Sequence, residues 1–242
     1  MNNVEKSFDL QAKLRRAAHY AAHALYPTRC VGCNVILPIN HIFCDDCEKD
    51  IRPLQSNLCR RCLNPPSRCE CDAVAPEYER AFAPFCYAGA VRNALLNLKD
   101  EKNGDLARYF AKQICDCIAA SGDDGDDIHF DCVMFVPMYR KRKRERGFNQ
   151  SELIAENVAD ILGIPIDRQT LTQTKPSKTQ HLLSPAERRD NVAGIYNAEP
   201  CDYESVLLID DIITTGCTAN SCAAALKAAG VGQVYCAAVA KA

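Results

Sequence analysis

Val206-Leu-Leu-Ile-Asp-Asp-Ile-Ile-Thr-Thr-Gly-Cys-Thr218 is the most informative stretch of this 242-residue chain. Its first four residues predict a buried strand over 206–209, and a helix is expected over 217–229. Small residues at a strand-to-helix turn let successive backbone N–H groups converge on one anion, and the helix N-terminus adds positive potential. The stretch therefore predicts a cradle for one phosphate, with hydroxyl donors from Thr214, Thr215 and Thr218.

Two acidic residues, Asp210 and Asp211, stand at the expected carboxyl end of this strand, where α/β sheets place their ligands. Paired carboxylates beside a phosphate cradle suit a ribose diol, with Mg²⁺ bridging nearby oxygens. A P-loop is one alternative, but its GxxxxGK[ST] pattern is absent from the sequence. The other is an acidic turn that caps a helix, and it does not explain the series of small and hydroxylic residues.

Strands and helices alternate around this stretch from residue 81 onward. We expect strands over 82–87, 132–136, 206–209 and 234–239, and helices over 91–98, 106–118, 149–162 and 217–229. An acidic turn over 123–127 reads as a solvated loop. Alternation of this kind predicts an α/β fold with a mainly parallel sheet and helices on both faces.

Cysteine is the anomaly of the composition, because eight of the 16 cysteines fall between residues 30 and 71. They form the sets Cys30, Cys33, Cys44, Cys47 and Cys59, Cys62, Cys69, Cys71. Four thiolates from paired knuckles close a tetrahedral shell around Zn²⁺, and Gly32 suits the tight turn of the first knuckle. Neither set leaves an open position, so both predict structural sites. Disulfides and a redox CxxC fit less well, and an iron–sulfur cluster stays open on spacing alone.

The cysteine segment has no helix or strand long enough to bury a core of its own, so bound metal is expected to fold it. Most of the other cysteines read as small buried hydrophobes. Cys217 opens a helix, but no paired base accompanies it, and we expect no nucleophilic role.

The rest of the composition is that of an ordinary globular chain. Apolar residues make up 48% and charged residues 25%, the net charge is −2, and no apolar run approaches the ~18 residues of a membrane span. An amphipathic helix over 7–25 has its apolar stretch interrupted by charged residues, so no secretory signal is recognised and we expect a cytoplasmic protein. The expected units are 1–26, 27–76 and 77–242.

A basic run over 140–146 holds six cations in seven positions. It follows a buried strand and Pro137, so we expect a loop at the sheet edge that also carries Asp210 and Asp211. Arginine binds phosphate oxygens bidentately, which suits pyrophosphate. A contact with single-stranded DNA stays open, although few aromatic residues accompany the run.

Residues 208–218 resemble the motif for 5-phosphoribosyl pyrophosphate (PRPP) of type I phosphoribosyltransferases, in which apolar residues, two acids and T-T-G-x-T follow each other. Further segments resemble the ComF family, which includes the ComFC competence proteins. These are the cysteine pairs, Val136-Pro137 with Arg142-Lys-Arg-Glu-Arg-Gly-Phe-Asn-Gln150, and Gln180-x-x-Leu-Ser184 with Arg188 and Asn191-Val192. The resemblance covers roughly residues 20–242.

The resemblance implies a type I phosphoribosyltransferase fold after a double zinc ribbon, and Mg²⁺-dependent phosphoribosyl transfer from PRPP to an acceptor that the sequence does not identify. It implies that the ribose diol and magnesium are held by Asp210 and Asp211, and the 5-phosphate by Thr214, Thr215, Gly216, Cys217 and Thr218. Pyrophosphate would be bound by Arg142, Arg144 and Arg146. A flexible loop carrying Lys175, Gln180 and Arg188 would close over PRPP.

Four positions depart from the family pattern. Tyr139 and Arg140 replace a common His-Pro pair, Lys143 replaces a leucine, and Ser177 replaces a threonine. These changes affect the expected pyrophosphate loop and leave the phosphate cradle intact. A second function is compatible with the same resemblance: a non-catalytic competence adaptor that binds single-stranded DNA or a helicase through the ribbons and the basic run.

Overall fold

The computed structural model describes residues 27–73, 75–100, 102–121, 128–176 and 194–242. The helix expected over 7–25 and the acidic turn over 123–127 lie outside these residues. The same holds for most of the expected flexible loop, from residue 177 to 193.

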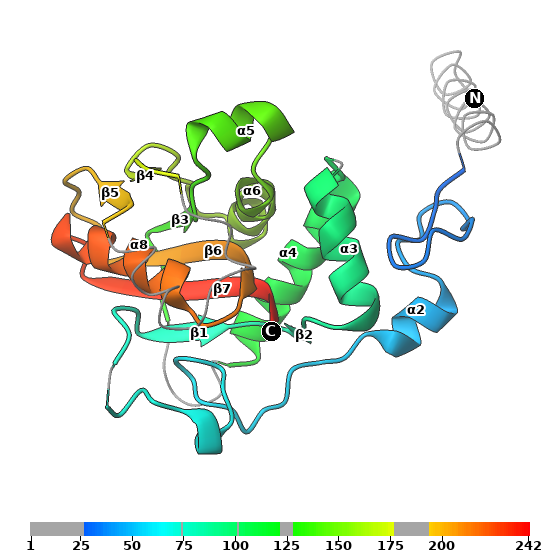
Figure 1. The fold of residues 1–242 in the computed structure, drawn as a ribbon, viewed down its shortest axis with the longest axis horizontal. Helices are drawn as coiled ribbons and strands as arrows, with labels where there is room; N and C mark the ends of the chain where they lie inside the picture. Colours follow the sequence, from blue (N-terminus) through cyan, green and yellow to red (C-terminus); the bar gives the residue numbers. More distant parts are fainter. Residues whose placement is uncertain (1–26, 74, 101, 122–127, 177–193) are drawn as a thin grey trace, which may run out of the picture.

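Five parallel strands form the central sheet, in which β1 and β2 both pair with β7, and β6 and β3 follow (Figure 1). Their bounds are Arg80–Phe82 for β1, Phe85–Cys86 for β2, Cys132–Phe135 for β3, Ser205–Ile213 for β6 and Gln233–Lys241 for β7. The mainly parallel sheet expected from the sequence is therefore confirmed.

Helices cover both faces of this sheet (Figure 1). On one face lie α3 (Gly89–Asp100), α4 (Gly104–Ala119) and α6 (Gln150–Leu162), and on the other lies α8 (Cys217–Ala228). Side chains alternate along a strand, so Val133 of β3 belongs to the first core and Cys132 to the second. Burial on both faces explains why these strands read as continuous apolar runs.

Three boundaries differ from the expected ones. The strand expected over 206–209 continues as β6 to Ile213, so both aspartates lie inside a strand. The strand expected over 82–87 is divided into β1 and β2, because Pro84 has no N–H for the ladder. The basic run is a helix, α5 (Arg140–Arg146), that ends at Gly147 with φ 87°, and it is not a loop.

A second, antiparallel sheet was not expected. It consists of β4 (Leu171–Gln173) and β5 (Tyr196–Ala198), which pair through Thr172 and Asn197. The residues just before Lys175 of the expected flexible loop are therefore ordered as a strand. Strand β5 lies against α8 on that helix's side of the sheet (Figure 1).

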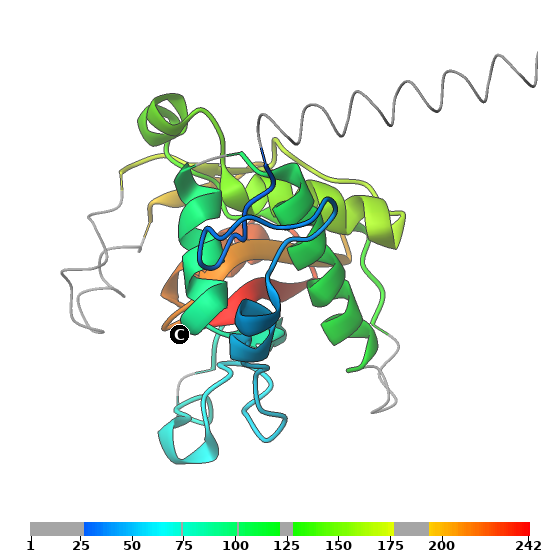
Figure 2. The same ribbon diagram turned by 90° about the vertical axis from the view of Figure 1, so that its right-hand side faces the viewer.

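The cysteine segment forms two ribbons, which we define as the first ribbon (residues 28–50) and the second ribbon (residues 59–71). They contain one short helix, α2 (Asp45–Asp50), and a 3₁₀ turn over Pro66–Arg68. Figure 2 shows the first ribbon lying across α3 and α4. Val31, Leu37 and Phe43 are buried in the same core cluster as these helices. These residues are buried against the α/β domain and not in a core of their own, so hydrophobic burial helps to hold the first ribbon in addition to the expected metal.

Candidate functional site

Each ribbon brings four cysteine sulfurs together. In both sets, Cys30, Cys33, Cys44, Cys47 and Cys59, Cys62, Cys69, Cys71, the sulfur atoms lie within 4.8 Å of one another. Four sulfurs that converge in this way match the ligand shell of tetrahedral Zn²⁺. No disulfide links any of these cysteines.

The two ribbons use the same turn to point their sulfurs inward. The residue after the first CxxC pair of each ribbon has a positive φ, 67° at Asn34 and 56° at Leu63, and its N–H donates to the carbonyl of the first cysteine of that pair. Gly32 is needed for a different reason than the expected turn, because a Cβ there would stand 2.7 Å from the Cys47 sulfur. Close approach of the backbone to the cluster therefore selects glycine.

A cavity of about 270 Å³ opens at the carboxyl edge of the central sheet. Its walls come from the ends of β3, β6, α3, α5, α6 and α8, so segments far apart in sequence meet there. The predicted site residues that line it are Asp210, Asp211, Thr214, Gly216, Thr218, Arg142 and Arg146. This is the position at which parallel α/β sheets hold their ligands.

Asp210 and Asp211 are adjacent acids with different partners. The Asp210 carboxylate accepts hydrogen bonds from the Ser151 hydroxyl, at 3.2 Å, and from the backbone N–H of Asp211. The Asp211 carboxylate accepts one from the Gln150 amide at 2.8 Å and pairs with the Lys99 ammonium at 3.2 Å. One acid is therefore charge-compensated and the other is not.

The pKa values of the pair diverge accordingly. Burial, together with the adjacent charge of Asp211, raises the pKa of Asp210 to about 8. Burial acts in the same direction on Asp211, but the Lys99 ammonium and the Gln150 amide outweigh it and lower the pKa of that carboxyl. An uncompensated carboxylate beside a compensated one suits a bound cation, because a cation removes the repulsion between them.

Helical geometry decides which arginines of α5 face the cavity. Arg142 and Arg146 stand one turn apart, and both line the cavity, whereas Arg144 does not. The Arg146 guanidinium donates to the Gln150 side-chain oxygen at 2.7 Å, so it is joined to Asp211 through one amide. The expectation that Arg144 shares the pocket with the other two is therefore corrected.

The phosphate loop is the turn over residues 214–218 between β6 and α8. Thr214, Gly216 and Thr218 line the cavity, but Thr215 and Cys217 do not. The Thr215 hydroxyl instead donates to the Cys217 sulfur at 3.0 Å. Gly216 has a φ of 78°, a left-handed conformation that favours glycine.

The expected flexible loop contributes little to the described cavity. Lys175 is exposed and outside the lining, and Gln180 and Arg188 are outside the residues that the structure describes. Pro176, at the end of the described part, does line the cavity.

Lys99 and Ser151 are functional residues that the sequence analysis missed. Both touch the paired acids, yet Lys99 is 112 positions away from Asp211 in the sequence. No motif marks a lysine in the last turn of a helix as the partner of a distant carboxylate. Ser151 carried a weak signal, since it stands two residues after Asn149, which caps α6 and accepts a hydrogen bond from the Ser151 N–H.

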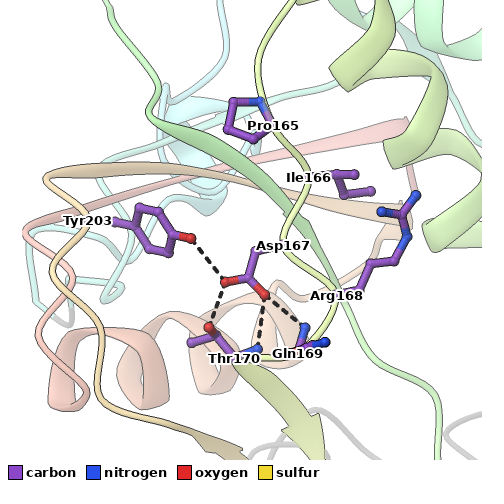
Figure 3. A pocket seen from close by; sticks show the side chains of 7 residues that line it. All are labelled: Pro165, Ile166, Asp167, Arg168, Gln169, Thr170 and Tyr203. Atoms are coloured by element: carbon purple, nitrogen blue, oxygen red, sulfur yellow. Dashed lines mark hydrogen bonds between the residues drawn. The ribbon is translucent and has the colours of Figure 1, made fainter.

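A second cavity, of about 360 Å³, lies elsewhere, at residues 165–170 and Tyr203 (Figure 3). Asp167 is at its centre, and its carboxylate already accepts hydrogen bonds from the N–H groups of Gln169 and Thr170 and from the hydroxyls of Thr170 and Tyr203. Arg168 pairs with Glu156. The polar groups of this cavity hold the turn together, so it is the weaker candidate for a ligand site.

Comparisons with known proteins agree with these features. The double zinc ribbon family matches residues 21–87. DNA utilization protein YhgH of Salmonella typhimurium is 29% identical over 220 residues, which cover 87% of this chain and 96% of that protein. Competence protein ComFC of Bacillus subtilis is 26% identical over 209 residues, 78% of this chain and 81% of that protein. Competence protein F of Haemophilus influenzae is 32% identical over 108 residues, 43% of this chain and 47% of that protein.

The ribbon match and the two cysteine clusters together identify structural zinc sites. The expected Zn²⁺ is thereby supported at both sets. None of the helices in the described ranges combines the length and the apolarity that crossing a bilayer requires.

Proposed function

Since this chain is a member of the ComF family, we propose that it binds PRPP and transfers the phosphoribosyl group to an acceptor, with release of pyrophosphate. Its family gives it a role related to DNA uptake. The main observation behind the proposal is that the paired acids, the phosphate loop and two arginines line the same cavity. Each of these groups suits a different part of PRPP.

The phosphate loop is suited to the 5-phosphate. The loop precedes the first turn of α8, so its N–H groups and the positive end of the helix act on the same oxygens. Asp210 and Asp211, which precede the loop in β6, would accept hydrogen bonds from the ribose hydroxyls. Arg142 and Arg146 stand on the remaining wall and would bind the pyrophosphate.

The paired acids also fit magnesium, because an uncompensated carboxylate is the oxygen donor that this hard cation prefers. Asp210 and Asp211 would hold the ion, which when bound neutralises charge on the pyrophosphate and on the acids. Lys99 and Gln150 keep the Asp211 carboxylate oriented into the cavity.

Transfer breaks the bond between C1 of the ribose and the pyrophosphate oxygen, which leaves with the electron pair, and forms a bond from the acceptor to C1. Positive charge develops on the sugar ring as the first bond breaks, and the nearby carboxylates stabilise it. Arg142 and Arg146 stabilise the departing negative charge. Positioning and electrostatics therefore supply most of the rate gain.

Isothermal titration with PRPP, with and without Mg²⁺, tests this proposal. We expect micromolar, magnesium-dependent binding by the wild-type protein, and its loss in the double variant Asp210→Asn/Asp211→Asn, because the ribose and the cation lose their carboxylates. Asp160→Asn, an exposed change on α6, is the matched control and should bind as wild type does. Absence of PRPP binding by folded, zinc-loaded wild-type protein would refute the proposal.

Direct contact with single-stranded DNA is a second candidate function. It is favoured by the outward face of α5, where Arg140, Lys141 and Arg144 are exposed and none of them lines the cavity. Lys143 on the same helix pairs with Glu152 at 2.5 Å and is less available. The two functions are compatible, because the two faces of α5 serve different ligands.

The double variant Lys141→Glu/Arg144→Glu should weaken binding of a single-stranded oligonucleotide and flatten its salt dependence. Two lost phosphate contacts lower the slope of log K against log salt by about 1.4. Lys112→Glu, on the exposed side of α4, controls for a charge reversal at a surface away from α5. An unchanged slope in the α5 variant would exclude direct contact through this face.

A further inference from the structure

Tyr78 lies between the second ribbon and the phosphate loop. It follows Cys71 by seven residues, is only 3% exposed, and shares a core cluster with Leu63 of the ribbon and Ala219 of α8. Burial raises the pKa of Tyr78, so its hydroxyl stays protonated. The strand that follows Tyr78 is bonded to the second ribbon, because the Ala81 N–H donates to the Arg60 carbonyl at 2.8 Å.

The Tyr78 hydroxyl occupies the space beside Gly216. A Cβ on Gly216 would stand 2.8 Å from the Tyr78 hydroxyl oxygen, closer than packed atoms allow. Gly216 also has a left-handed φ, which only glycine adopts readily. The loop backbone is therefore restricted both by its own conformation and by the contact with Tyr78. Among the glycines that the structure describes, Gly89 and Gly230 share both restrictions, but neither lies in the cavity.

The residue before Tyr78 is bonded to the start of α8. The Glu77 N–H donates to the Asn220 side-chain oxygen at 2.7 Å, and the Asn220 N–H donates to the Gly216 carbonyl at 2.8 Å. These two bonds connect the chain that leaves the second ribbon to the middle of the phosphate loop.

Lys241 of β7 holds the first residue of the phosphate loop from another side. Its ammonium donates to the Thr214 carbonyl at 2.7 Å. The loop is thus fixed at Thr214 by the end of a strand that pairs with both β6 and β1.

The first ribbon is attached elsewhere. The side chains of Asn93 and Asn97 on α3 donate to the carbonyls of Gly32 and Val31, and the Asp50 carboxylate accepts from the Ala90 N–H at the start of α3. These contacts hold the helix that carries Lys99, not the phosphate loop. The two ribbons therefore support different walls of the cavity.

We propose that Tyr78 is a positioning residue through which the second ribbon holds the phosphate loop in its binding shape, so that the loop depends on metal at Cys59, Cys62, Cys69 and Cys71. The inference rests on the proposed function for the ligand that the loop binds. The coupling itself is a property of the chain and is testable without that ligand.

Hydrogen exchange of the Asn220 and Glu77 amides reports directly on this coupling. We expect Tyr78→Leu and Cys69→Ser to speed exchange at both amides about tenfold, because the loop opens locally without its support. Tyr78→Phe keeps the ring and should change the rates less than about threefold. Zinc content should fall from two ions to one in Cys69→Ser and stay at two in Tyr78→Leu.

Cys33→Ser, which removes a ligand of the first ribbon, is the matched control. It should speed exchange of the Ala90 amide and should affect the Asn220 amide less than Cys69→Ser does. Equal loosening of Asn220 by both cysteine variants, or no change in Tyr78→Leu, would overturn the proposal. If Cys69→Ser fails to fold, Tyr78→Leu decides, since it leaves the metal ligands intact.

A double-mutant cycle adds a second readout. Gly216→Ala places a methyl group against the Tyr78 hydroxyl, and Tyr78→Phe removes that oxygen. The loss of PRPP affinity caused by Gly216→Ala should therefore be about threefold smaller in the Tyr78→Phe background. Strict additivity would contradict the contact. A wild-type protein that does not bind PRPP would count against the proposed function alone, because amide exchange still decides the role of Tyr78.

Discussion

Cys33→Ser is expected to lower the free energy of unfolding by about 5 kcal/mol, although Cys33 is exposed and outside the hydrophobic core. Serine is nearly isosteric with cysteine, so the variant loses little besides a zinc ligand. Binding of structural zinc contributes on the order of 10 kcal/mol to the folding free energy of a small domain. For a chain of this length the loss corresponds to a melting temperature lower by about 10–20 °C.

The effect extends beyond the ribbon because the ribbon is part of the main core. Val31, Leu37 and Phe43 pack with α3 and α4, and Cys47 lies against Gly32 in the same cluster. We therefore propose that residues 27–76 and 77–242, although separate units by sequence, unfold in one transition.

Thermal unfolding followed by circular dichroism, with zinc measured by mass spectrometry, checks this prediction. Cys115→Ser is the control, since Cys115 is buried in α4 and belongs to neither four-cysteine set. This change should lower the free energy of unfolding by only about 1 kcal/mol. A Cys33→Ser protein with the same zinc content and the same melting temperature as wild type would show that this set holds no metal.

Much of the phosphate side of the pocket was readable from the sequence. Local signals suffice there, because the strand, the acids and the small residues follow one another within 13 positions, 206–218. The sequence did not show that β6 continues through Asp210 and Asp211, since acidic residues are poor strand formers and only pairing with β7 extends the strand.

The placement of the basic residues in the pocket could not be predicted from the local sequence. A run without apolar residues gives no helical period, so α5 was expected as a loop and Arg144 was grouped with Arg142 and Arg146. Once the run is a helix, residues four apart share a face and the third arginine turns away.

Lys99 and the first ribbon illustrate long-range packing. Val31 and Phe43 stand between cysteines without any period, so nothing in the local sequence indicates that they reach the core of the α/β domain. The β4–β5 pair was missed for the same reason, because its strands are three residues long and separated by 22 positions.

Asp210→Asn is expected to stabilise the protein at alkaline pH and to abolish turnover. Because the pKa of Asp210 is raised to about 8 in the folded protein, against about 3.9 in an unfolded chain, the folded state binds the extra proton. That contribution to stability is fully present below about pH 4 and is lost as the pH rises through 8. The wild-type protein therefore loses stability over this interval, and the variant does not.

Between pH 5 and pH 9 the stability of the variant relative to wild type should rise by about 4 kcal/mol, because wild type loses about 1.4 kcal/mol for each of the three pH units up to 8. Melting temperatures of both proteins between pH 5 and 9, without Mg²⁺, measure this difference. Thiolate protonation at the zinc sites affects both proteins equally and cancels. Asp167 and Asp211, whose pKa values are lowered, do not titrate in this interval.

The same substitution should lower PRPP turnover at least about a hundredfold, since a carboxylate that faces the developing positive charge is replaced by a neutral amide. Stability should thus rise while turnover falls. If the carboxylate of Asp210 served folding, its replacement by an amide would destabilise the protein. If it serves ligand binding, the same replacement relieves the repulsion from Asp211 but removes the function. Asp160→Asn should change neither quantity. A variant that is destabilised at pH 9, or that retains full turnover, would remove Asp210 from the site.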